Sequence, residues 1–174
     1  MAKGLPRSHA HRPKADQNMV KHHIPVNHSI DSVTVTTAIG FGSVVIGDFP
    51  EGNILLLGAL ANLTFTGPTS ADLVDTWEGD FGIGSTPSSD ATISAGDEDL
   101  VAETALAAAT AEVSPTTRGV SIPGTAGVVL DNTDGSLEVN LNLLVDAADQ
   151  TDDTTVAITA VGDVYLSYVV LGDD

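Results

Sequence analysis

Short runs in which apolar and polar residues alternate recur along most of this chain. The clearest runs are residues 32–39, 136–143, 155–161 and 164–171. Successive side chains of a β-strand point to opposite faces, so a period of two predicts strands that bury one face. The pattern therefore predicts a body built of strands rather than helices.

Turn residues separate these runs at intervals of roughly 8–12 residues. Gly58 interrupts an apolar strand expected over residues 54–66, and a glycine at this place predicts a β-bulge. The segment Asp-Asn-Thr-Asp-Gly at 131–135 predicts a tight hairpin turn. Shorter strands are expected at 43–47, 91–94, 119–122 and 126–130. Many short strands of this kind predict an all-β fold, an antiparallel β-sandwich or a jelly roll.

The last three strong runs, with a turn at Gly162-Asp163, predict an antiparallel meander. The run at 164–171 carries apolar residues on both faces, which indicates either a central strand or a strand at a contact between subunits. On this basis we expect a homo-oligomer, and a trimer rather than a dimer. The Ala-rich segment 100–112 fits either a short helix or an irregular connection.

The chain divides into two parts by periodicity and charge. Residues 1–28 have no apolar period and contain three prolines, which predicts an extended arm, whereas residues 29–174 form the β-sandwich domain. The arm holds five basic residues and one acid, for a net charge of +4 with histidine neutral. The domain holds one basic residue, Arg118, and 23 acids, for a net charge of −22.

Composition excludes several classes of protein. The chain has no cysteine, which excludes disulfides, thiolate metal sites and a thiol nucleophile, and fits synthesis in a reducing cytoplasm. No window approaches the ~20 apolar residues of a membrane helix, and no apolar stretch follows the basic N-terminus as in a signal peptide. An acidic domain repels both nucleic acid and anionic membranes, so neither is an expected partner.

No motif of the chain points to catalysis, so we expect a protein that is not an enzyme. All five histidines lie in the arm, where packing does not hold them as a catalytic triad requires. The glycines of residues 79–84 have no following helix or nearby lysine, so they fit β-turns better than a phosphate loop. Paired carboxylates for sugar cleavage remain an alternative, although Trp77 is the only tryptophan available as a sugar platform.

No metal or other cofactor is expected. The acidic turns at 131–135 and 146–153 do not match the spacing of a calcium loop, and acidic turns are common without metal. The histidine pairs of the arm lack a fixed geometry for zinc.

The basic arm is the feature with the clearest functional content. We expect it to dock on an acidic protein surface, either a neighbouring copy or a shell, with Arg7, Arg12, Lys14 and Lys21 as anchors. The alternative is an inert tail. A domain this acidic needs no help with solubility, which favours docking.

Four segments resemble virion proteins of marine tailed phages. They are residues 60–66 (LANLTFT), 75–87 (DTWEGDFGIGSTP), 90–92 and 107–115, within a resemblance that spans residues 54–145. The resemblance rests on the spacing of glycine, tryptophan and threonine. It implies a structural protein on the capsid surface, of the decoration (cement) type, with the major capsid protein or other virion subunits as partners. It assigns no functional residue.

Two other functions stay open from the sequence. One is another part of the virion, such as a head-fibre base, a tail component or a baseplate component. The other is a carbohydrate-binding or adhesive β-domain of a microbe adapted to saline water, which would need exposed aromatic residues around Trp77.

Overall fold

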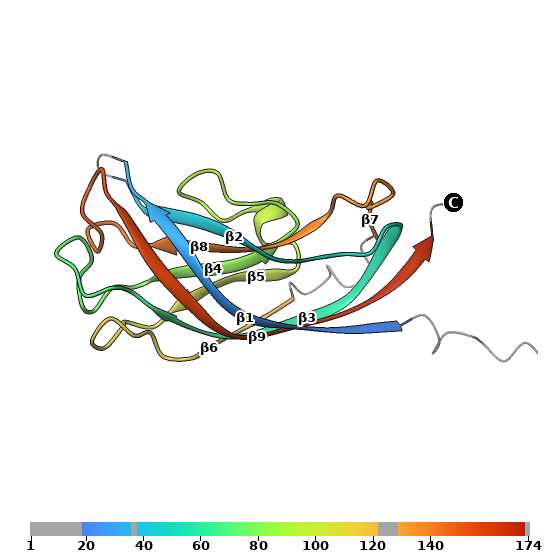
Figure 1. Ribbon diagram of the computed structural model, residues 1–174, viewed down its shortest axis with the longest axis horizontal. Coiled ribbons are helices and arrows are strands. Elements are labelled where there is room, and N and C mark those ends of the chain that lie inside the picture. The colour runs from blue at the N-terminus through green and yellow to red at the C-terminus, as the bar shows by residue number, and fades with distance from the viewer. Residues whose placement is uncertain (1–18, 36–37, 122–128, 173–174) are drawn as a thin grey trace, which may run out of the picture.

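Nine β-strands make up nearly all of the regular structure in the residues that the computed structural model describes, which are 19–35, 38–121 and 129–172 (Figure 1). In chain order the strands are β1 (Met19–Val33), β2 (Gly40–Asp48), β3 (Asn53–Thr66), β4 (Gly79–Gly84), β5 (Val101–Leu106), β6 (Thr117–Val120), β7 (Val129–Leu130), β8 (Glu138–Val145) and β9 (Thr155–Gly172). The only helical segment within these ranges is a single 3-10 turn at Ala95–Asp97. The all-β fold expected from the period of two is confirmed.

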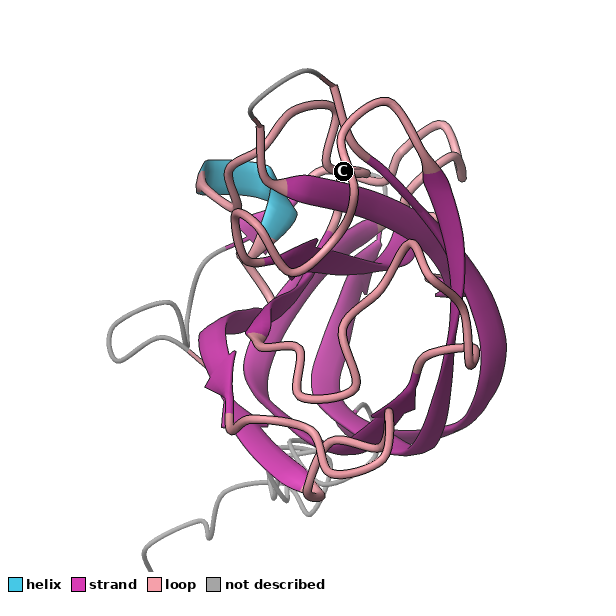
Figure 2. Cartoon of the chain, turned by 90° about the vertical axis from the view of Figure 1, so that its left-hand side faces the viewer, coloured by secondary structure: helices cyan, strands magenta, loops and turns pink. Residues whose placement is uncertain are grey.

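The strands pair antiparallel in two four-stranded halves. One half has the order β1-β9-β3-β6 and the other β2-β8-β4-β5, and the short β7 also pairs with β3. The halves join at one side where Val33 of β1 pairs with Phe41 of β2, while β5 and β6 lie against each other at the opposite side. The strands therefore curve around a shared interior (Figure 2). This interleaved order is that of a jelly roll, one of the two folds that the sequence predicts.

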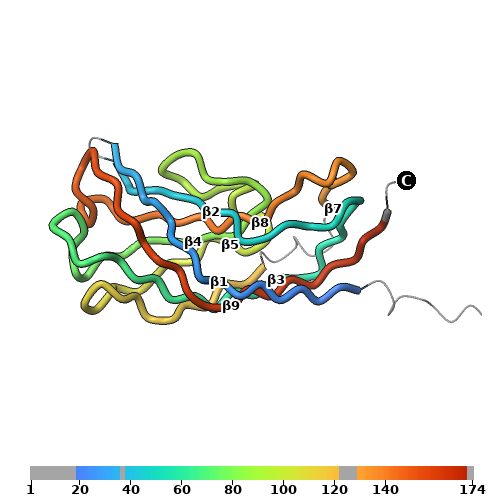
Figure 3. The backbone as a smooth tube through the Cα atoms, viewed as in Figure 1, coloured from blue at the N-terminus to red at the C-terminus, as the bar shows by residue number. Residues whose placement is uncertain are grey.

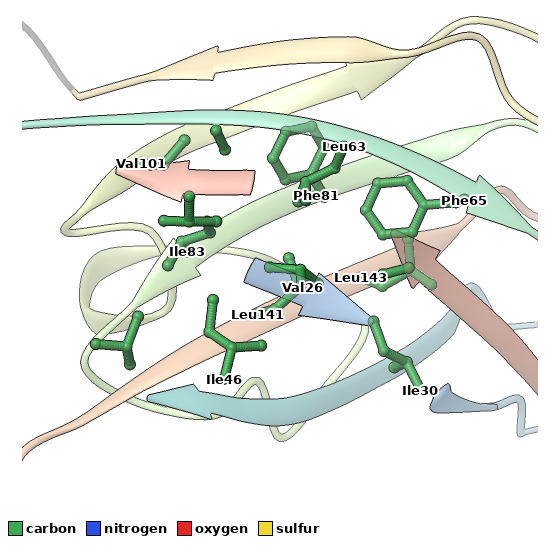
Figure 4. Close-up of a cluster of buried hydrophobic side chains, with 14 of the residues drawn as sticks. Val26, Ile30, Ile46, Leu63, Phe65, Phe81, Ile83, Val101, Leu141 and Leu143 are labelled. Atoms are coloured by element: carbon green, nitrogen blue, oxygen red, sulfur yellow. The ribbon is translucent and has the colours of Figure 1, made fainter. Parts of the chain in front are cut away.

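The core fills the space between the two halves with aliphatic side chains and a few aromatic rings (Figure 4). The rings of Phe65 and Phe81 meet there at a centroid distance of 5.5 Å. The largest side chains with less than 2% exposure are Trp77, Phe65, Phe81, Ile30, Ile54, Leu56, Leu63, Ile83, Leu100, Leu141, Leu143 and Ile158. These residues come from both halves, so the core unites them in one domain.

The two expected C-terminal strands are one continuous strand, β9, and the expected turn at Gly162-Asp163 is wrong. Gly162 has a φ of +152°, and a Cβ at this position would lie 2.0 Å from the carbonyl oxygen of Asn62 on β3. The missing side chain lets β3 approach, so pairing continues past the glycine. β9 lies between β1 and β3, which makes it the central strand that the apolar pattern allowed. The expected meander is also wrong, because β8 pairs with β2 and β4.

Some of the other local expectations are confirmed and some are wrong. The bulge at Gly58 is confirmed by a shift of register between Leu56 and Gly58. The strand expected at 91–94 is absent from this described segment. The Ala-rich segment 100–112, expected as a short helix or an irregular connection, contains strand β5. The segment 131–135 does turn, with the Gly135 amide donating to the Asn132 carbonyl at 3.0 Å, but it is no hairpin because β7 and β8 pair with different strands.

The N-terminal boundary of the domain needs a correction, because residues 19–28 belong to β1 and not to an extended arm. β1 pairs with β9 along its whole length, from Met19 opposite Val169 to Val33 opposite Thr155. Residues alternate between the two faces of this segment, and Ile24 and Val26 are buried in the core. The many polar and basic residues make this period of two hard to recognise in the sequence. Residues 1–18, the rest of the expected arm, lie outside the described residues.

Candidate interaction surface

Four apolar side chains form a row across the outer side of one half of the sheet. Met19 of β1 pairs with Val169 of β9, Val169 with Leu55 of β3, and Leu55 with Val129 of β7. Directly paired residues share a face, so all four point away from the core. Met19 and Val129 are 45% and 48% exposed. β1, β9 and β3 run side by side here (Figure 3).

Exposed apolar residues extend this row in both directions. Leu57, the extra residue of the bulge in β3, is 40% exposed, and Leu171 near the end of β9 is 53% exposed. A second row runs from Tyr165 on β9 through Leu60 on β3 to Val120 on β6. We call this surface the outer apolar face. It consists of Met19, Leu55, Leu57, Leu60, Val120, Val129, Tyr165, Val169 and Leu171.

Charged residues are also distributed unevenly between the strands of the outer apolar face and the rest of the described chain. The described ranges contain 21 acidic residues, of which only Asp31 and Asp163 lie on β1, β9, β3, β6 or β7. Both described basic residues, Lys21 and Arg118, lie on these strands as well. The strands of the outer apolar face are therefore neutral with histidine uncharged, whereas the rest of the described chain carries 19 acids and neither lysine nor arginine.

A polar cluster lies beside the apolar rows. The Nε2 atom of His23 on β1 lies 2.6 Å from Oδ1 of Asp163 on β9, and its ring stacks on Tyr165 at a centroid distance of 4.8 Å. The three histidines at positions 22, 23 and 28 are thus held in a strand, which corrects the expectation that all histidines lie in a loose arm. In the part of the chain that the structure describes, no hydroxyl is hydrogen-bonded to the His23 ring.

β1 borders the outer apolar face, and its edge away from β9 is only partly paired with another strand. Within the described ranges Val33 with Phe41 is the one pairing of β1 with β2, although a Cβ at Gly42 of β2 would meet the Asp31 backbone and one at Gly47 would meet Ile24. Pro25 lies in the middle of β1. Proline is tolerated in a sheet at such an edge and limits pairing by another chain, because it has no amide hydrogen.

Two carboxyl groups of the acidic part of the surface have raised pKa values. Burial, followed by the nearby charge of Asp146, raises the pKa of Asp80 on β4. Burial, followed by Asp80 and Glu98, raises the pKa of Glu103 on β5. These strands belong to the other half of the sheet, so the repulsion lies away from the outer apolar face.

The expected anchors are only partly placed. Lys21 is exposed on β1, opposite Ser167 of β9, on the same side as the outer apolar face. Arg7, Arg12 and Lys14 lie outside the described residues. The outer apolar face itself was missed from the sequence, because its rows depend on which strands are neighbours. The signal that could have pointed to it is the apolar second face of residues 164–171.

Two other candidate sites take structural roles. Trp77 is fully buried and its indole Nε1 donates to the Glu112 carbonyl at 3.0 Å, so it offers no platform for a sugar ring. In the acidic turn, Asp131 and Asp134 accept hydrogen bonds from Thr133 and Ser136, and these bonds lower the pKa of both carboxyls. The described residues contain no cluster of ligating side chains suited to a metal ion, and none of their helical segments could span a membrane.

No family model matches the chain, and no curated protein matches it. Among solved structures the chain is similar to one described as "Cyanophage Pam1 capsid asymmetric unit", with 16% identity and a TM-score of 0.39 over 98% of this chain and 91% of that chain.

Proposed function

We propose that this chain is a non-enzymatic structural protein of a tailed-virus particle that decorates or cements the capsid surface. The observation that carries the proposal is the division of the body into a neutral outer apolar face and an acidic remainder. A contiguous exposed apolar surface marks a contact with protein or membrane. A subunit that lies in a shell needs this combination, with one side against protein and a charged side toward water.

The assignment to a virion rests on the segments that resemble phage proteins. In the structure, the segments 60–66 and 75–87 supply the core residues Phe65, Trp77 and Phe81. The resemblance therefore concerns residues that determine how this body packs. Jelly rolls are used by viral capsid proteins and by lectins. The burial of Trp77 weighs against the lectin-like alternative, because the chain has no other tryptophan for a sugar platform.

Attachment through the N-terminal arm is the finer part of the proposal. Residues 1–18 carry Arg7, Arg12 and Lys14, and they join the body at Met19, at the edge of the outer apolar face. An extended chain spans about 3.5 Å per residue, so the chain from Met19 to Lys14 or Arg12 can span at most roughly 18–25 Å. They can therefore reach an acidic surface beside the subunit, with Lys21 on β1 as the fourth anchor.

Quantitative mass spectrometry of purified particles of the encoding virus tests the assignment. A decorating subunit is expected in a fixed ratio to the major capsid protein, and the ratio should persist through repeated density-gradient purification. Absence from the particles, or a ratio that falls with each round of purification, contradicts the proposal.

A further inference from the structure

We propose that the outer apolar face binds a second copy of this chain. The inference deepens the proposed function by naming one partner and its surface, and it can fail while the protein remains a virion component. Its starting point is the row Met19–Val169–Leu55–Val129, which crosses four strands on the solvent side of the sheet.

Electrostatics restrict how two copies can meet. Outside β1, β9, β3, β6 and β7 the described chain has 19 acids and no lysine or arginine. Contact between two such surfaces places like charges together, which is unfavourable and costs more as water is excluded. The outer apolar face avoids this repulsion, because Lys21 and Arg118 balance Asp31 and Asp163 on its strands.

The same balance distinguishes a second copy from other partners. A basic partner is attracted to the acidic remainder rather than to a neutral face, and an acidic partner gains little from a net charge of zero. A second copy presents apolar rows of the same kind, and it offers a carboxylate for each cation and a cation for each carboxylate. A closed dimer in which both copies use the same patch meets these conditions, and a trimer that uses the face in a ring meets them as well.

Pro25 restricts the alternative in which two copies join by adding strands. The edge of β1 that does not pair with β9 makes few ladder pairs and would otherwise be a template for pairing with another chain. A proline in the middle of that edge lacks an amide hydrogen, which interrupts a ladder along β1. Contact through the exposed side chains of the face is thus favoured over edge pairing.

Sedimentation equilibrium of the purified full chain tests the inference with two matched variants. Leu57→Glu adds a charge on the face at a side chain that is 40% exposed, and Val74→Glu adds the same charge at a loop side chain that is 41% exposed. The two variants have the same net charge, and the two substituted side chains are almost equally exposed, so the variants differ mainly in the position of the added charge. We expect Leu57→Glu to weaken self-association by at least about tenfold and Val74→Glu to leave it unchanged. Circular dichroism verifies the fold of each variant, and Leu171→Glu replaces Leu57→Glu should the latter unfold.

Three results overturn the inference. The wild-type chain can be a monomer at all concentrations, the face variant can associate like the wild type, or both variants can weaken association equally. A monomer whose Leu57→Glu variant also loses its place on virus particles assigns the face to a capsid subunit instead of to a second copy.

Discussion

The imidazole of His23 and the carboxylate of Asp163 meet at 2.6 Å although 140 positions separate them in the chain. They meet because β1, the first described strand, pairs along its length with β9, the last strand. The N-terminal segment from Met19 onward is therefore part of the body. Any test of the arm has to leave this strand in place.

Two truncations should differ sharply in stability. Removal of residues 1–28 deletes ten residues of β1, including the buried Ile24 and Val26, each worth about 1.5–3 kcal/mol of burial. Against a total stability of about 5–15 kcal/mol, this loss should unfold the body or lower its melting temperature strongly. Removal of residues 1–18 should leave melting nearly unchanged. Thermal unfolding followed by circular dichroism measures both, and equal melting of the two truncations would show that β1 is dispensable.

Asn140 and Asn142, two neighbouring asparagines of β8, should differ in how much stability the same substitution costs. Asn142 accepts from the Ser88 amide at 2.8 Å and donates to the carbonyls of Thr86 and Asp97, which holds this loop on the sheet. Asn142→Leu should cost at least about 2 kcal/mol and speed hydrogen exchange in the loop. Asn140 is as deeply buried, yet its side-chain atoms have no hydrogen-bond partner among the described residues. Asn140→Leu should stay within about 1 kcal/mol of the wild type or be more stable. Urea unfolding decides, and a costlier Asn140→Leu would contradict the account.

Gly162 and Gly58 form a second matched pair. A Cβ at Gly162 would lie 2.0 Å from the Asn62 carbonyl oxygen, whereas one at Gly58 meets only the Ser121 hydroxyl, at 3.9 Å. Gly162→Ala should cost about 1–3 kcal/mol or more, because backbone must move, and Gly58→Ala should be nearly neutral. Chemical denaturation measures both free energies. A Gly162→Ala protein as stable as the wild type would mean that β3 and β9 do not pair closely at this point.

Glu103 on β5 should make stability fall as pH rises. Burial, then Asp80 and Glu98, raise the pKa of Glu103 above its ordinary value in the folded state. The folded protein therefore holds this proton more tightly than the unfolded chain, and stability falls as pH rises through the raised pKa. Glu103→Gln should raise the melting temperature at neutral pH and change it little where glutamate is protonated.

Asp134 serves as a control, because its effect on stability should change with pH in the opposite direction to that of Glu103. Hydrogen bonds from Ser136 lower the pKa of its carboxyl, so the ionised form stabilises the fold above the unfolded pKa. Asp134→Asn should lower the melting temperature at neutral pH and have little effect in acid. Melting curves over a pH series check both signs. If Glu103→Gln also destabilises at neutral pH, the repulsion around it is unimportant.

Strand content could be predicted from the sequence because a period of two is a local signal, but strand limits depended on contacts with distant residues. The continuity of β9 was missed at Gly162, since a glycine that turns the chain and one that allows the close approach of Asn62 look alike in sequence. β1 was missed because its outward positions hold Lys21, His23 and Pro25, which resemble a disordered arm. The loop held by Asn142 depends on a residue 54 positions from Ser88.

The candidate surface was less predictable than the fold. Charge counts along the chain divide it into a basic arm and an acidic body, and this division does not reveal a neutral face within the body. Lys21 and Arg118 lie far apart in sequence and reach one sheet through the order β1-β9-β3-β6. Met19 and Val129 share a row for the same reason. Such a face emerges only when the partners of each strand are known.

The most direct test of the account returns purified protein to virus particles from which it has been removed and measures its copy number on them. The full chain is expected to bind to its original copy number, and the chain without residues 1–18 is expected to fold yet leave most sites empty. Binding of the full chain should weaken with added salt but persist, since exposed ion pairs contribute only about 0.2–1 kcal/mol each. Failure of the full chain to bind, or full occupancy by the truncated chain, would contradict attachment through the arm.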